Sequence, residues 1–117
     1  MFVKRFSEAK SYDANNHRGN HGVRLQGFEA GGPTNQWVGL SHFLPGGGAG
    51  PDSTPFEKVY VILEGEMTVI IGAKETVLKK LDSCTIAPGE VREIINRSNA
   101  VCSMLVVVPY PPGHKHA

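Results

Sequence analysis

Apolar residues alternate with polar ones, or run together in short blocks, along most of the chain after its first third. These blocks lie at residues 37–44, 58–63, 67–71, 75–79, 83–87, 91–95 and 103–108. They are rich in the β-branched and aromatic residues that favour strands. Glycine and proline separate them, as at residues 45–50 and 88–89, which indicates that turns break the chain there. Because helical periodicity is limited to one turn near residues 7–10, the pattern predicts an all-β domain.

Along residues 58–63, both faces of the expected strand carry apolar side chains, Tyr60 on one face and Val61 on the other. We therefore expect strands that are covered on both sides, as in a sandwich or a small barrel. A glycine turn at Gly65 follows and is a hairpin signal, so residues 58–63 and 67–71 are expected to pair.

The chain length predicts one domain, because 117 residues suffice for one hydrophobic core and not for two. We expect residues 1–36 to form an N-terminal arm with an edge strand near residues 22–26. Residues 37–109 are expected to form the β-barrel domain, and residues 110–117 a tail rich in proline and histidine.

Composition and charge exclude several classes of protein. Apolar residues make up 40% of the chain and charged residues 20%, which is typical of globular proteins and argues against disorder. The net charge of +1 comes without a basic run, so nucleic-acid binding is not expected. The longest apolar run near the C-terminus, residues 104–108, is too short to cross a membrane, and the N-terminus does not resemble a signal peptide. A cytoplasmic protein is expected.

The stretch from Gly46 to Gly65, GGGAGPDSTPFEKVYVILEG, resembles the first motif of the cupin family, G-x5-H-x-H-x3-E-x6-G. Its two glycines fit the motif without a gap, so the two histidine positions fall on Asp52 and Thr54 and the glutamate position falls on Lys58. The resemblance implies a cupin-like double-stranded β-helix, or jelly-roll barrel.

Residues 81–96 resemble the second cupin motif, G-x5-P-x-G-x2-H-x3-N, through Gly89 and Asn96. The histidine position of this motif is held by Arg92, and the first glycine and the proline of the motif are not in their places. The resemblance extends over residues 37–109 and implies a single-domain cupin.

The positions that hold metal ligands in cupins are Asp52, Thr54, Lys58 and Arg92 in this chain. Cupin metals are bound by imidazole and carboxylate groups, and only Asp52 is a good ligand here. Because two cationic neighbours would repel a divalent ion, we expect no metal and no other cofactor at this place. A metal-dependent cupin with atypical ligands, drawn from Asp52, Glu57 and a histidine, is left as an alternative.

The resemblance implies that these four side chains project into the barrel mouth. We expect Asp52 to pair with one of the two cations, because a buried charge needs a partner. The surplus positive charge predicts a site for a small carboxylate-bearing metabolite, with Arg92 as a planar two-point clamp and Lys58 as a point charge. Thr54 would add a hydrogen bond. The alternative is a structural salt-bridge cluster that fills a former metal site.

Alternation along the strands predicts further contacts with the ligand. The additional candidates are Ser41, Phe43 and Met104, and also His17 if the N-terminal arm folds over the barrel mouth.

Lys58 and Tyr60 share one strand face and are candidate catalytic residues. Burial beside a second cation could lower the pKa of Lys58, which would then act as a base or a Schiff-base nucleophile, with Tyr60 as the acid. A lyase, decarboxylase or isomerase is therefore the alternative to a non-catalytic binding module, and enzymatic activity is left open.

The remaining histidines lie outside both motifs. His17 and His21 are in a glycine- and asparagine-rich stretch that predicts a loop, and alternation places His42 on the face opposite the cavity, where it could meet a partner subunit. His114 and His116 in the tail offer weak metal binding at most. Small barrels associate through strand edges and apolar outer faces, so a homodimer is expected.

Overall fold

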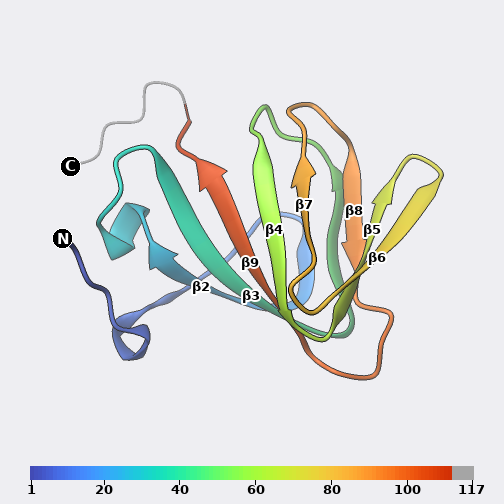
Figure 1. Ribbon diagram of the computed structural model, residues 1–117, viewed down its shortest axis with the longest axis horizontal. Coiled ribbons are helices and arrows are strands. Elements are labelled where there is room, and N and C mark those ends of the chain that lie inside the picture. The colour runs from blue at the N-terminus through green and yellow to red at the C-terminus, as the bar shows by residue number, and fades with distance from the viewer. Residues whose placement is uncertain (112–117) are drawn as a thin grey trace.

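Antiparallel strands make up most of the computed structural model, which describes residues 1–111 (Figure 1). The strands are β1 (Ser11–Tyr12), β2 (His17–Gln26), β3 (Gln36–Asp52), β4 (Lys58–Glu64), β5 (Glu66–Ile71), β6 (Lys74–Lys79), β7 (Ser83–Ile86), β8 (Arg92–Ile95) and β9 (Cys102–Pro109). Two 3-10 turns, η1 (Phe6–Glu8) and η2 (Phe28–Ala30), precede β1 and β3. Within the described residues, neither helical segment could span a membrane. The tail histidines His114 and His116 lie outside the described part of the chain.

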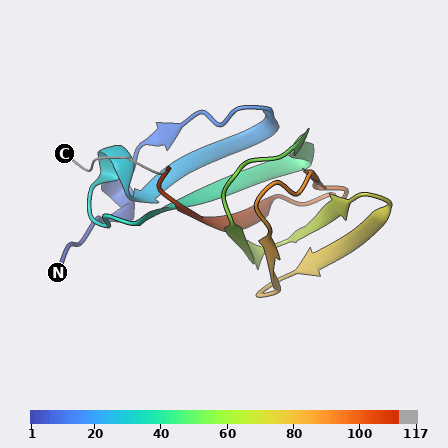
Figure 2. The same cartoon turned by 90° about the horizontal axis from the view of Figure 1, so that it is seen from above.

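The strands form one curled sheet in the order β6-β5-β8-β3-β9-β4-β7, and β2 pairs with β3 and with β1. Seen from above in Figure 2, the sheet curls so that the β5–β6 hairpin lies at one end of the molecule and the N-terminal segment at the other. The largest fully buried side chains include Phe43, Ile62, Met67, Ile94 and Met104, which form the core inside the curl. The prediction of an all-β, jelly-roll barrel is confirmed.

The predicted pairing of residues 58–63 with residues 67–71 is wrong. β4 pairs with β7 and β9, whereas β5 pairs with β6 and β8. Gly65 has a φ of 78°, and its backbone passes so close to the Val101 carbonyl that a side chain would collide with it. This tight glycine turn therefore carries the chain from one wall of the barrel to the other and does not close a hairpin.

The break predicted at residues 45–50 is also wrong, because β3 continues through this segment as one strand. Its first half pairs with β9, where Phe43 lies opposite Cys102, and its second half pairs with β8, where Gly48 lies opposite Ile95. A side chain at Gly48 would collide with the carbonyl oxygen of Ile94. The glycines are thus needed for close backbone approach, and they let β3 pass from one wall to the other.

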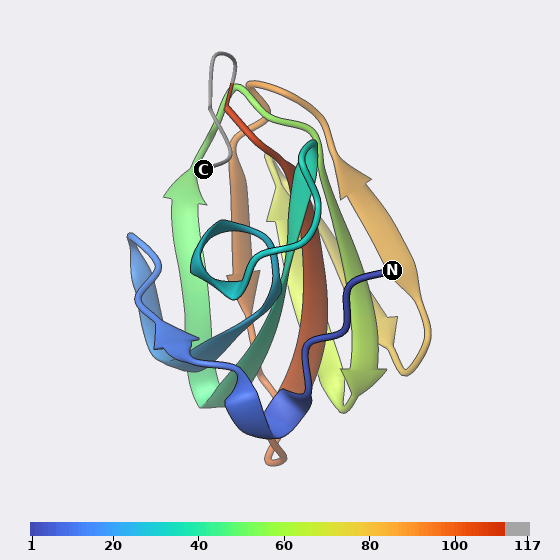
Figure 3. The same cartoon turned by 90° about the vertical axis from the view of Figure 1, so that its left-hand side faces the viewer.

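The loop predicted around His17 and His21 is the first half of β2, which begins five residues before the strand expected near residues 22–26. Its glycine-rich sequence pairs with the glycine-rich part of β3, where a side chain at Gly47 would collide with the carbonyl oxygen of Gly19. Tertiary pairing therefore overrides local preference here. The N-terminal segment is a wall of the barrel, and Figure 3 looks onto the end of the molecule where η2 joins β2 to β3.

The two faces of β4 differ in burial. On the inward face Tyr60 and Ile62 are buried, whereas Val59 and Val61 on the outward face are half-buried. Strands covered on both sides were expected, but β4 is fully covered only on its inward face. The homodimer, in which a second chain would cover an outward face, stays a prediction.

Candidate functional site

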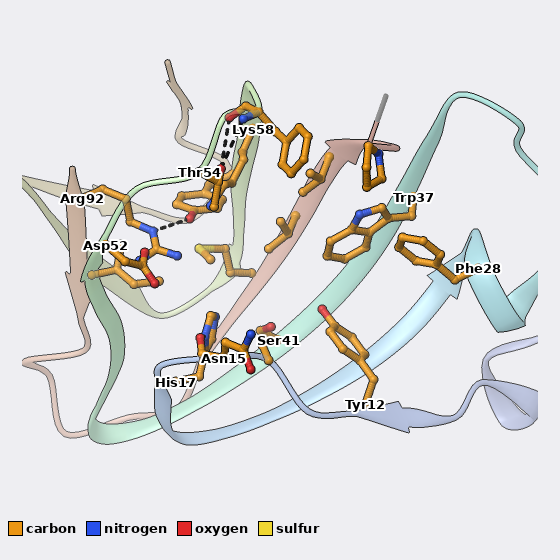
Figure 4. A pocket seen from close by; sticks show the side chains of 18 residues that line it. Tyr12, Asn15, His17, Phe28, Trp37, Ser41, Asp52, Thr54, Lys58 and Arg92 are labelled. Atoms are coloured by element: carbon orange, nitrogen blue, oxygen red, sulfur yellow. Dashed lines mark hydrogen bonds and ion pairs between the residues drawn. The ribbon is translucent and has the colours of Figure 1, made fainter. Parts of the chain in front are cut away.

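The barrel encloses a cavity of about 340 Å³, close to the lower end of the roughly 300–1,000 Å³ range of ligand sites. Figure 4 shows that Asp52, Thr54, Lys58 and Arg92 gather at one end of this cavity, which we call the polar end. The segments that hold these residues are the end of β3, the connection to β4, β4 itself and β8.

Arg92 is the centre of the polar end and is only 4% exposed. Cross-strand register places it opposite Asp52, and its Nη1 lies 2.7 Å from Asp52 Oδ1. Its Nε donates a hydrogen bond of 2.8 Å to the Tyr60 hydroxyl. The prediction that Asp52 pairs with one of the two cations is confirmed, and the partner is Arg92.

These contacts change what Arg92 can offer to a ligand. Two of its three guanidinium nitrogens are already held by Asp52 and Tyr60. Within residues 1–111, only Nη2 is left without a hydrogen bond. The two-point clamp predicted for Arg92 is therefore used inside the protein, and the Nη2 amino group remains for a ligand.

Lys58 supplies the uncompensated charge of the polar end. It is 8% exposed, and none of the ion pairs formed within residues 1–111 includes it. Burial lowers the pKa of Lys58, the Arg92 guanidinium lowers it further, and Asp52 opposes both effects. One carboxylate and two cations thus meet here, with Lys58 as the cation that lacks a partner.

Because the folded-state pKa of Lys58 is lowered, the ammonium destabilises the folded chain at neutral pH. This penalty disappears as pH rises through the folded pKa toward the ordinary value of lysine. Lys58→Met is expected to raise the free energy of unfolding at pH 7 by about 1 kcal/mol. The gain over the wild type should shrink at alkaline pH, as measured by urea denaturation at a series of pH values. The matched control is Lys79→Met, at an exposed position of β6, which should change little. A loss of stability in Lys58→Met would contradict an unpaired ammonium.

His17 reaches the cavity from the start of β2. Its Nδ1 lies 2.7 Å from the Asn15 carbonyl oxygen. Burial lowers the pKa of the imidazole, the hydrogen bond to Asn15 opposes this effect, and the Arg92 cation adds to the lowering. The ring is therefore neutral at pH 7. Because a carbonyl only accepts hydrogen bonds, Nδ1 carries the hydrogen and Nε2 is left as an acceptor. His17 can accept a hydrogen bond from a ligand hydroxyl.

The other predicted contacts divide between the cavity and the core. Thr54, Ser41 and Met104 line the cavity. Phe43 does not line it; this fully buried side chain stacks on the His17 ring, with ring centroids 6.2 Å apart. His42 faces away from the cavity, as expected, and its Nδ1 lies 2.8 Å from the Ser103 hydroxyl.

Sequence reasoning missed the opposite end of the cavity. Tyr12, Phe28 and Trp37 line it (Figure 4), and we call this group the aromatic end. Trp37 shares the alternation of Ser41 along β3, so the strand pattern contained a signal for it. Tyr12 and Phe28 lie in a two-residue strand and a 3-10 turn, which are too short to show periodicity.

The donor set at the polar end does not fit a metal ion. Asp52 is held by Arg92, and Asp52 and His17 are the only carboxylate and imidazole among the described lining residues. Glu57, the other predicted atypical ligand, is exposed and does not line the cavity. Across residues 1–111, no group of three or more histidine, cysteine, aspartate and glutamate residues gathers at one place. The atypical metal site considered as an alternative is therefore not assembled in this part of the chain.

The family model of the cupin domain matches residues 39–108, which is more than half of the chain. The chain belongs to the cupin family. Asp52, Lys58, Tyr60 and Arg92 of this cupin all lie within the matched residues, whereas the whole aromatic end precedes them.

This cupin is also similar to individual proteins. It is 46% identical over 111 residues to a Mycobacterium tuberculosis protein named beta-D-galactosidase, covering 95% of this chain and 96% of that one. The polyketide cyclase RemF from Streptomyces resistomycificus has a similar structure, with a TM-score of 0.82, 18% identity, and coverage of 93% of this chain and 79% of RemF. A predicted oxalate decarboxylase from Thermotoga maritima has a TM-score of 0.76 and 24% identity, covering 94% and 100% of the two chains. The two solved structures show a shared fold.

Proposed function

We propose that this cupin binds a small galactose-like sugar acid in the barrel cavity and holds it with its own side chains instead of a metal ion. The observation that carries the proposal is the polar end, where a buried Lys58 without an ionic partner adjoins the Asp52–Arg92 pair. A buried cation of this kind is stabilised when an anion binds beside it. A carboxylate on the ligand would supply that anion.

The groups around Lys58 favour a ligand that carries hydroxyls. His17 Nε2 is an acceptor, and the Tyr60 hydroxyl accepts from Arg92 while its own hydrogen stays available as a donor. Ser41 and Thr54 add two more hydroxyl groups to the lining. This mixture of donors and acceptors suits a sugar ring, whose hydroxyls both donate and accept hydrogen bonds.

The choice of a galactose-like ring is supported by the similarity to the Mycobacterium tuberculosis protein. The alignment covers nearly the whole of both chains. The name of that protein refers to an activity on galactosides. A galactose ring is therefore the first ligand to test.

Isothermal titration calorimetry with galacturonate, galactose and glucuronate tests the proposal. We expect galacturonate to bind at least about tenfold more tightly than galactose, because one charge-assisted hydrogen bond is enough to give that ratio. The ratio should fall toward one in Lys58→Met and persist in the exposed control Lys79→Met. Equal affinities in the wild type, or a ratio that survives in Lys58→Met, would contradict the role of the charge. A failure of all three sugars to bind would contradict the proposal itself.

Hydrolysis of a β-D-galactoside is a second candidate function, favoured by the name of the relative. Glycosidases usually employ two carboxyl groups, but Asp52 is the only carboxylate among the described lining residues. The proton donor would then have to be another group. Tyr60 is suitable, because burial raises its pKa and keeps the phenol protonated, although the Arg92 cation opposes this effect.

Release of 4-nitrophenol from 4-nitrophenyl β-D-galactoside tests this second candidate. Under this candidate, the wild type releases nitrophenol and Asp52→Asn and Tyr60→Phe lose at least about 100-fold in rate. If both variants keep the wild-type rate, neither Asp52 nor Tyr60 takes part in the hydrolysis. The lyase or isomerase chemistry, with Lys58 as the base and Tyr60 as the acid, is tested by following galacturonate by NMR in the wild type and in Lys58→Met.

A further inference from the structure

We propose that the aromatic end, Tyr12, Phe28 and Trp37, is a second binding subsite that takes a flat apolar ring carried by the sugar. The physiological ligand would then be an aryl glycoside or a similar sugar derivative, with its sugar at the polar end and its ring at the aromatic end. This inference rests on the proposed function, because the sugar must lie at the polar end for its substituent to extend in this direction.

The three rings form a wall of the cavity and do not fill the core. The Tyr12 and Trp37 centroids are 5.8 Å apart in an edge-on arrangement, and those of Phe28 and Trp37 are 5.9 Å apart and tilted. All three side chains are half-buried and line the cavity, unlike Phe43, which is fully buried. Gly39 beneath them makes the room, since a side chain there would collide with the Tyr12 hydroxyl.

Arg24 fixes the three rings from a position outside the cavity lining. Its guanidinium carbon lies 3.9 Å from the Tyr12 ring centroid, 4.5 Å from that of Trp37 and 4.7 Å from that of Phe28. A guanidinium within about 6 Å of a ring attracts its face, so one cation orders all three rings. A wall that is already ordered loses less conformational entropy when a ligand binds, which suits a recognition surface.

Charge is absent from the lining of the aromatic end: among the described lining residues, the aspartate, lysine and arginine are Asp52, Lys58 and Arg92, all at the polar end. Arg24, which packs on the rings, forms an ion pair of 3.3 Å with Glu29. A charged group on the ligand would therefore gain nothing there, whereas an aromatic group gains ring contacts and apolar burial. The chemistry of this end favours a neutral ring.

The separation of the two ends of the cavity suits a ligand with two parts. Trp37 and Ser41 point into it from the same face of β3, four residues apart, which corresponds to about 13 Å along a strand. Met104 and Val106 of β9 line the cavity between the two ends, so the connecting surface is apolar. A ligand that reaches both ends must carry an apolar group beyond its sugar.

Calorimetry with a matched pair of ligands, methyl and phenyl β-D-galacturonide, tests the inference in the wild-type protein. We expect the phenyl compound to bind about tenfold more tightly. Trp37→Leu should lose this preference while keeping its affinity for the methyl compound. The control Phe6→Leu replaces an exposed aromatic residue of η1 and should keep the preference. Phenol release is followed in parallel, so that any turnover is recognised.

Trp37 is the only tryptophan in the chain, so its fluorescence reports directly on this end. The phenyl compound should shift its emission to shorter wavelength by excluding water, and the methyl compound should not. This readout uses the wild type, and Phe28→Leu provides a second variant should Trp37→Leu fail to fold.

The outcomes separate the two proposals. If both compounds bind equally well, the aromatic subsite is overturned and the sugar-acid site stands. A phenyl preference that persists in both Trp37→Leu and Phe28→Leu also overturns it, because the ring would then bind elsewhere. If neither compound binds, both the subsite and the proposed function are overturned.

Discussion

Replacing Arg92 by leucine should lower the free energy of unfolding by about 3 kcal/mol and abolish the binding of sugar acids. Arg92 is almost fully buried and holds both Asp52 and Tyr60. Its loss leaves the Asp52 carboxylate without its ionic partner beside the cavity. Because the Asp52 side chain is 33% exposed, we expect the lower end of the range for a broken buried pair. The midpoint of urea denaturation measures the effect.

A double replacement separates the lost ion pair from lost packing. Arg92→Leu combined with Asp52→Leu removes both charges, and such changes are often far less costly than removing one partner. The double variant should therefore be more stable than Arg92→Leu alone. Equal stabilities would contradict a dominant role for the unpaired carboxylate. Arg92→Lys keeps the charge but not the planar contacts, and its stability should lie between those of the wild type and Arg92→Leu.

Phe43→Ala is expected to be the most destabilising single change in the barrel, at about 4 kcal/mol. Phe43 is fully buried in the core cluster, and truncation would leave a cavity there. Its neighbour Leu44 is 57% exposed, so Leu44→Ala on the same strand should change stability by at most about 0.5 kcal/mol. Thermal and urea denaturation of both variants measure the difference.

The milder variant Phe43→Leu tests how this side chain affects the site. Because Phe43 contacts His17 and does not line the cavity, its effect on a ligand must pass through the imidazole. We expect Phe43→Leu to fold and to weaken galacturonate binding less than His17→Ala does. A larger loss in Phe43→Leu than in His17→Ala would indicate that Phe43 contacts the ligand itself.

The polar end was predictable from the sequence because spacing within the motifs fixes which residues face inward. Asp52, Lys58 and Arg92 fall on positions that face the cavity, and alternation adds Tyr60 to them. Which cation pairs with Asp52 could not be predicted, since the choice depends on cross-strand register. That register places Asp52 opposite Arg92.

The connections between strands were less predictable, because glycine occurs both in turns and where two backbones approach closely. The segments at residues 45–50 and at Gly65 were interpreted as a turn and a hairpin, from local preference alone. In the structure both allow close approach to a neighbouring backbone, which depends on segments far away in the sequence. The same reasoning explains β2, whose glycine-rich start is a strand only because it pairs with the glycines of β3.

The two ends of the cavity come from different stretches of the chain. The aromatic end and His17 precede the residues that match the cupin family model, and the polar end lies within them. Side chains of the aromatic end can therefore be replaced without changing the residues of the polar end. Under the proposed aromatic subsite, replacing Tyr12, Phe28 or Trp37 would change the ligand preference while the Asp52–Arg92 pair stays intact. Side-chain replacement at these three positions would then be a direct way to redesign specificity.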